Sequence, residues 1–142
     1  MTTEPRTVNV LLVDDDAVDA RAVRRAFREH KIGNPLFRAR DGLEALDMLR
    51  GANGADPVPG PRMVLLDLNM PRMGGIEFLK ELREDPELGG TVVFVLTTSE
   101  ADEDRAAAYK EHIAGYIVKS DVGERFLSLV RLLDAYWRVV AL

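Results

Sequence analysis

Five short apolar runs alternate with longer amphipathic segments, and this alternation constrains the fold more than any other feature. The runs cover residues 8–13, 36–39, 63–67, 92–97 and 115–118. Segments with helical spacing follow them at residues 18–30, 43–49, 75–83, 101–111 and from 122 to near the C-terminus. Strands that alternate with helices predict right-handed βαβ units and a five-stranded parallel sheet in the α/β class. Continuous Val and Leu content in the first, third and fourth runs predicts burial on both faces.

Length and composition predict a single domain that spans residues 1–142, with a core of about residues 8–130 and a last helix that extends to about residue 140. The net charge of −5 argues against nucleic-acid binding. No apolar run approaches the roughly 20 residues that a membrane span needs, and the N-terminus lacks the apolar segment of a signal peptide. The chain has no cysteine, which excludes disulfides and fits a cytoplasmic location.

Polar residues follow four of the apolar runs directly. Asp14, Asp15 and Asp16 follow the first run, Asp67 closes the third, and the fourth and fifth lead into Thr97 and Lys119. In a parallel sheet with right-handed crossovers, all strands end at one edge, and ligands bind outside that edge. We therefore expect these residues, distant in sequence, to meet at one rim.

Such a rim has a specific chemistry. Two carboxylates about 5 Å apart repel by roughly 3 kcal/mol at an effective dielectric near 20, so three of them favour a cation in their midst. Oxygen ligands without cysteine or a nearby histidine point to magnesium or manganese. A magnesium ion and Lys119 would neutralise an incoming phosphoryl group. Asp67 would then attack phosphorus and form an acyl phosphate.

These motifs resemble, as a set, the receiver domains of CheY-like response regulators over nearly the whole chain. The turn at residues 70–75, Met-Pro-Arg-Met-Gly-Gly, matches as well. The resemblance implies a doubly wound (βα)5 fold of the flavodoxin/CheY type with strand order 2-1-3-4-5. It places the family's acidic pair, phosphoacceptor, hydroxyl residue and lysine at Asp14 and Asp15, Asp67, Thr97 and Lys119. The chain departs from the family pattern at Ser120, where proline is usual.

The same resemblance implies a metal site and a switch. Asp15, Asp67 and the backbone carbonyl of Asn69 would hold Mg²⁺ directly, and Asp14 would act largely through water. Tyr116 lies where the family often has a switching aromatic residue that is coupled to Thr97.

The implied function is that of a two-component response regulator. Asp67 would accept a phosphoryl group from a histidine kinase in a magnesium-dependent reaction. The protein would catalyse only its own phosphorylation and dephosphorylation, so it is not expected to be an enzyme otherwise. With no output domain predicted, the signal would pass to an unidentified downstream protein. Within the family, the C-terminal segment and residues 96–99 resemble the stand-alone regulators paired with phytochrome histidine kinases, which makes such a kinase the expected partner.

The last predicted helix carries two adjacent apolar rows, which is more than docking on a sheet requires. Phe126, Val130, Leu133, Trp137 and Val140 form one row, and Leu129, Leu132, Tyr136 and Val139 form the other. Because a wide exposed apolar stripe often marks an interface, we expect a homodimer through this helix. The expected interface residues are Leu129, Leu132, Tyr136, Trp137 and Val139. The alternative is a C-terminal tail that folds back over the domain.

Three other interpretations stay open. The aspartates and Thr97 could simply cap helices, since such residues are common before a helix. The chain could be a receiver-like adaptor that binds partners without being phosphorylated. It could also be a phosphatase of the haloacid-dehalogenase type with Asp14 as nucleophile, although that hypothesis leaves Asp67 without a role and lacks a further acidic pair after Lys119.

Overall fold

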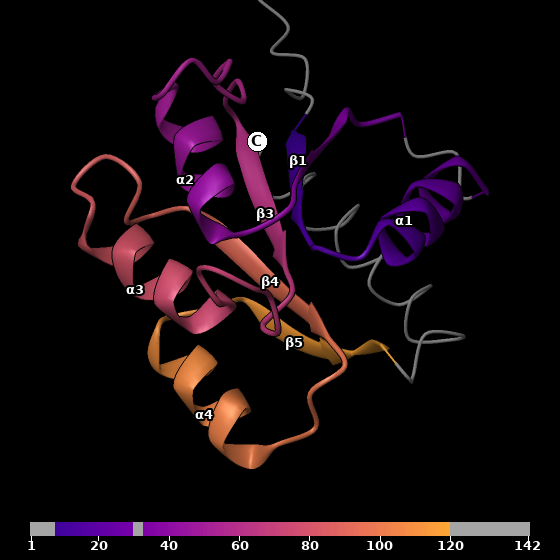
Figure 1. Ribbon diagram of the computed structural model, residues 1–142, viewed down its shortest axis with the longest axis vertical. Coiled ribbons are helices and arrows are strands. Elements are labelled where there is room, and N and C mark those ends of the chain that lie inside the picture. The colour runs from indigo at the N-terminus through magenta and orange to yellow at the C-terminus, as the bar shows by residue number, and fades with distance from the viewer. Residues whose placement is uncertain (1–7, 30–32, 120–142) are drawn as a thin grey trace, which may run out of the picture.

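The computed structural model describes residues 8–29 and 33–119 of the 142-residue chain, and these form a three-layer α/β domain (Figure 1). Its strands are β1 (Asn9–Val13), β2 (Leu36–Ala39), β3 (Arg62–Leu66), β4 (Val92–Thr97) and β5 (Gly115–Val118). All neighbouring strands pair in parallel, in the order β2-β1-β3-β4-β5. The predicted fold class, strand number and strand order are therefore confirmed.

Four helices connect these strands, and each begins within one residue of its predicted start. They are α1 (Ala17–Glu29), α2 (Gly42–Arg50), α3 (Gly75–Glu84) and α4 (Asp102–Lys110). The helix predicted from residue 122 onward lies outside the described residues, as do the five expected dimer-interface residues. Among the helices at residues 8–29 and 33–119, none is long and apolar enough to cross a membrane.

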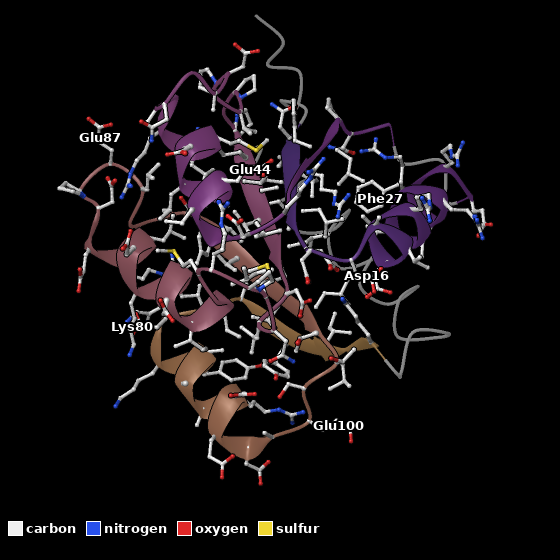
Figure 2. The ribbon with its side chains drawn as sticks, in the orientation of Figure 1. Asp16, Phe27, Glu44, Lys80, Glu87 and Glu100 are labelled. Atoms are coloured by element: carbon white, nitrogen blue, oxygen red, sulfur yellow. The ribbon has the colours of Figure 1, made fainter. Side chains whose placement is uncertain are left out.

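The sheet divides the described core into two layers. In Figure 1, α1 lies on one side of the sheet, and α2, α3 and α4 lie on the other. Because side chains alternate along a strand, Leu12 and Leu65 face α1, whereas Leu11 and Val64 face the other three helices. On the α1 side, the helix contributes Ala20, Val23 and Phe27, which pack in one cluster with Leu12 and Leu65 of the sheet. Phe27 is marked in Figure 2. Burial on both faces explains why the central strands read as unbroken apolar runs.

Arg83 ties together two loops at the amino ends of β4 and β5. Its guanidinium donates hydrogen bonds of 2.6–3.1 Å to four backbone carbonyl oxygens, those of Gly89, Thr91, Glu111 and His112. Burial lowers the pKa of Arg83 because it disfavours the charged form. We name these four acceptors the Arg83 carbonyls. This contact lies at the edge of the sheet opposite the polar rim, so it supports the strands without taking part in the site.

Candidate functional site

The register of the sheet brings the predicted site residues to one edge. Val13 of β1 pairs with Leu66 of β3, so the next residues, Asp14 and Asp67, lie side by side. Thr97 pairs with Val118, and Lys119 follows at once. Parallel strands end on the same edge, which is why residues more than 100 positions apart in sequence meet here.

Among residues 8–29 and 33–119, three carboxylates cluster to form the acidic part of the site. Each of Asp14, Asp15 and Asp67 offers an oxygen within 4.8 Å of the others, a spacing that could hold a metal ion. Asp14 and Asp67 are buried, at 1% and 5% exposure, whereas Asp15 is exposed. Unit charges 4.8 Å apart repel by about 3.5 kcal/mol at an effective dielectric near 20. Burial raises the pKa of Asp14, although the hydrogen bond from Lys119 opposes this shift. The donor set is all oxygen, which suits a hard divalent cation.

Asp16 does not join this trio. Its Oδ1 accepts hydrogen bonds from the backbone N–H groups of Val18 and Asp19, at 2.8 and 3.3 Å, and these bonds lower the pKa of its carboxyl group. Figure 2 marks Asp16 beside the start of α1. For this one aspartate the helix-capping interpretation was therefore the right one.

Lys119 neutralises part of the acidic charge. Its Nζ donates to Asp14 Oδ2 at 2.7 Å, to Asp19 Oδ2 at 2.8 Å and to Asp67 Oδ2 at 3.4 Å. Burial opposes the charged amine, but the hydrogen bonds that Lys119 donates to Asp14 and Asp19, together with the charge of Asp67, outweigh burial, so the pKa of Lys119 rises. Asp19 carries no signal of this role in the sequence, because a carboxylate in the first turn of a helix is ordinary.

The two oxygens of Asp67 have different surroundings. Oδ1 accepts hydrogen bonds from the Thr97 hydroxyl at 2.9 Å and from the Asn69 backbone N–H at 3.3 Å. Among the described residues, the only hydrogen bond to Oδ2 is the long one from Lys119. The carboxylate is thus held through one oxygen, while the other is left available for reaction.

Tyr116 connects to Thr97 through the β4–α4 loop rather than by direct contact. Its hydroxyl donates to the Ser99 carbonyl at 3.0 Å, and the Ser99 N–H donates to Thr97 Oγ1 at 3.4 Å. The Arg105 guanidinium lies 5.0 Å from the centre of the Tyr116 ring, within cation–π range. Burial raises the pKa of Tyr116. Sequence reasoning paired Tyr116 with Thr97 and missed Ser99 and Arg105 as the groups in contact with it.

The loop after Asp67 is fixed by close backbone contacts. A Cβ atom at Gly75 would lie 2.7 Å from the Asp67 carbonyl oxygen and 2.7 Å from Leu68 Cα, so only glycine fits there. Arg72 has a positive φ of 64° and pairs with the buried Asp41, the N-cap of α2, at 2.9 Å. The loop therefore holds the backbone of Asp67 at a fixed distance from α2 and α3.

Comparison with known proteins identifies the family. The model of the response regulator receiver domain matches residues 10–131. The chain belongs to the response regulator receiver family. This family acts in two-component signalling with a histidine kinase as partner, and its members are not metabolic enzymes.

Individual relatives support the same assignment. Response regulator Rcp1 of Synechocystis sp. is 34% identical over 90% of this chain and 87% of its own length. The crystal structure of its Mn²⁺-bound form superposes with a TM-score of 0.78, covering 92% of this chain and 94% of that one. The phosphorylated cyanobacterial phytochrome response regulator RcpA is 31% identical and superposes with a TM-score of 0.82 over 96% of this receiver and 98% of its own chain. FilR2, a probable methanogenesis regulatory protein of Methanothrix harundinacea, is 37% identical over 90% of this chain and 82% of its own.

Proposed function

We propose that Asp67 of this receiver accepts a phosphoryl group from a histidine kinase. Its Oδ2 attacks phosphorus, the bond from phosphorus to the kinase histidine nitrogen breaks, and the bonding electrons leave with that nitrogen. The observation that carries the proposal is the setting of the Asp67 carboxylate, which clusters with those of Asp14 and Asp15. Its Oδ2 lies 3.4 Å from Lys119 Nζ, while Oδ1 accepts a hydrogen bond from Thr97. Lys119 would balance the negative charge that the phosphoryl oxygens bring.

We infer that Mg²⁺ is the cofactor of this reaction. Asp14, Asp15 and Asp67 supply carboxylate oxygens at metal-binding spacing, and Asn69 lies two residues beyond Asp67. Magnesium binds through one or two carboxylates plus phosphate and keeps several waters, which suits so sparse a set. When bound, the ion would supply positive charge to the transferring phosphoryl group. The Mn²⁺-bound form of Rcp1 supports a divalent ion in this family.

We further propose that Thr97 and Tyr116 carry the signal away from Asp67. The Thr97 hydroxyl now donates to Asp67 Oδ1, so a phosphoryl group on Asp67 offers that hydroxyl a new acceptor. A shift of Thr97 would disturb the hydrogen bond that its Oγ1 accepts from the Ser99 N–H. The Ser99 carbonyl in turn accepts a hydrogen bond from the Tyr116 hydroxyl, so the disturbance would reach Tyr116. The face formed by α4 and β5 would then change its contacts with a downstream protein.

We propose a single receiver domain over residues 1–142 that works in the cytoplasm, with a core of about residues 8–130. The family match over residues 10–131 supports these core limits. Because RcpA is described as a phytochrome response regulator, we propose a phytochrome-type histidine kinase as the upstream partner. We expect the downstream protein to bind the receiver more tightly in one of its two states, phosphorylated or unphosphorylated at Asp67.

We also propose a homodimer through the C-terminal segment. This proposal rests on sequence alone, on the apolar residues Leu129, Leu132, Tyr136, Trp137 and Val139 at helical spacing. Sedimentation of the purified protein at high micromolar concentration, with and without phosphorylation, should show a dimer in at least one state. A monomer in both states would remove the dimer proposal and leave the folded-back tail.

Acetyl phosphate labelling tests the proposed reaction and separates it from its alternatives. With Mg²⁺, the wild type should take up about one phosphoryl group per chain and Asp67→Asn none. The adaptor hypothesis predicts no labelling of either protein. The phosphatase hypothesis predicts that Asp14→Asn abolishes labelling and Asp67→Asn does not, yet it gives no reason for Asp67 to lie at the centre of the site.

A further inference from the structure

Of the described carboxylates that accept a hydrogen bond from Lys119, Asp19 is the one that belongs neither to the candidate metal site nor to the phosphoacceptor. It lies in the first turn of α1, and its Oδ2 accepts from Lys119 Nζ at 2.8 Å. The contact is nearly as short as the one from Lys119 to Asp14, at 2.7 Å, and shorter than the one to Asp67, at 3.4 Å. Two of the three hydrogen bonds that Lys119 Nζ donates, those to Asp14 and Asp19, thus lie on the β1–α1 side of the site.

The distances show what this arrangement does to Asp67. Asp14 and Asp19 together hold Nζ at 3.4 Å from Asp67 Oδ2, a distance at which the hydrogen bond is weak. A phosphoryl group bound to Oδ2 would place its own oxygens between Oδ2 and the amine. The amine would then lie close to the phosphoryl oxygens, and its 3.4 Å contact leaves Oδ2 only weakly hydrogen-bonded.

We propose that Asp19 is a positioning residue for phosphotransfer, which holds Lys119 back from the attacking oxygen of Asp67. The inference rests on the proposed phosphorylation of Asp67. If a divalent ion were bound by Asp14, Asp19 would be the described carboxylate that still holds the amine toward α1. Without Asp19, Lys119 moves onto Asp67 Oδ2, and this stronger hydrogen bond must break before Oδ2 attacks phosphorus.

Single substitutions test the inference in the full chain with acetyl phosphate and Mg²⁺. The side chain of Asp19 is 37% exposed, so its ion pair is of the moderate kind, and Asp19→Asn should lower the maximal labelling rate by about two- to fivefold. The half-saturating concentration of acetyl phosphate should not change, because the donor does not contact Asp19. Asp19→Glu keeps a carboxylate within reach of Lys119 and should restore most of the rate.

Asp16→Asn is the matched control. It removes a negative charge three residues away, keeps a good helix cap and leaves the contacts of Lys119 in place. Its maximal rate should stay close to that of the wild type. Asp19→Ser, too short to reach the amine, is a second variant that should be as slow as Asp19→Asn, and thermal unfolding checks that all variants are folded.

Each outcome decides the matter. The inference is overturned if Asp19→Asn and Asp19→Ser are labelled at the wild-type rate or faster. It is also overturned if Asp19→Glu is as slow as they are, or if Asp16→Asn is equally slow, because the effect would then come from the helix or from overall charge. A wild type that takes up no phosphoryl group refutes the proposed function itself, whereas normal wild-type labelling with unaffected Asp19 variants refutes only the role of Asp19.

Discussion

The ion pairs of Lys119 predict that Lys119→Met lowers the free energy of unfolding much more than Arg50→Met, although each substitution removes one cation. Lys119 is only 12% exposed, and it contacts Asp14 and Asp67, which are both buried. Removing one partner of a buried ion pair leaves an uncompensated charge and typically destabilises a protein by about 3–5 kcal/mol. We therefore expect Lys119→Met to lower the free energy of unfolding by about this amount at neutral pH without divalent ions.

The exposed pair of Arg50 with Asp85 provides the control. It has a similar length of 3.0 Å, but the arginine side chain is 39% exposed. Exposed pairs contribute at most about 1 kcal/mol, so Arg50→Met should change the free energy of unfolding by no more than that. Urea unfolding followed by circular dichroism measures both variants. Equal and small losses for the two would refute the argument that the acids at the rim depend on Lys119.

The loss of unfolding free energy caused by Lys119→Met should depend on pH in a definite direction. The pKa of Lys119 is raised on folding, so its stabilising contribution is fully present at and below neutral pH and is lost only as pH rises through the folded value. The pKa of Asp14 is also raised, so Asp14 binds a proton early as pH falls. The gap between wild type and Lys119→Met should therefore narrow toward acid pH. Saturating Mg²⁺ should narrow it too, because the ion supplies the missing positive charge.

Three further substitutions should have effects of known direction in the same urea assay. Asp14→Asn leaves Lys119 its contacts with Asp19 and Asp67, so it orphans no buried cation. Because burial raises the pKa of Asp14, the ionised carboxylate opposes folding at neutral pH, and this substitution should make the metal-free protein more stable there; a loss of stability would contradict this. Gly75→Ala places a Cβ against the backbone of Asp67 and should destabilise by about 1–3 kcal/mol or more; a neutral effect would show that the loop yields. Arg83→Met leaves the Arg83 carbonyls without their donor and should cost more than about 2 kcal/mol; a smaller loss would mean that water replaces the guanidinium.

The part of the site that sequence predicted is the part that topology controls. Asp14, Asp67, Thr97 and Lys119 each follow an apolar run, and parallel pairing alone brings such residues to one edge. The same pattern placed every described strand within one residue of its observed bounds. In β1, β3 and β4 the reason is burial on both faces, which makes each strand an unbroken apolar run.

The contacts that sequence missed depend on geometry within loops and helix ends. Asp19 reaches Lys119 because the first turn of α1 lies against the site, and no spacing in the sequence encodes that approach. Tyr116 reaches the Ser99 carbonyl rather than Thr97, since a backbone group in a loop has no signature in residue type. The expected dimer interface stays a prediction, because residues 120–142 lie outside the described part of the chain.

Chemical mapping of the phosphorylated residue tests the central claim most directly. Borohydride reduces an aspartyl phosphate to homoserine, so protein treated with acetyl phosphate and Mg²⁺, then reduced and digested, reports the reacting residue by mass spectrometry. We predict homoserine at residue 67 and aspartate at residues 14 and 15. Homoserine at residue 14, or none at any aspartate of a protein that has bound Mg²⁺, would contradict the claim that Asp67 is the phosphoacceptor.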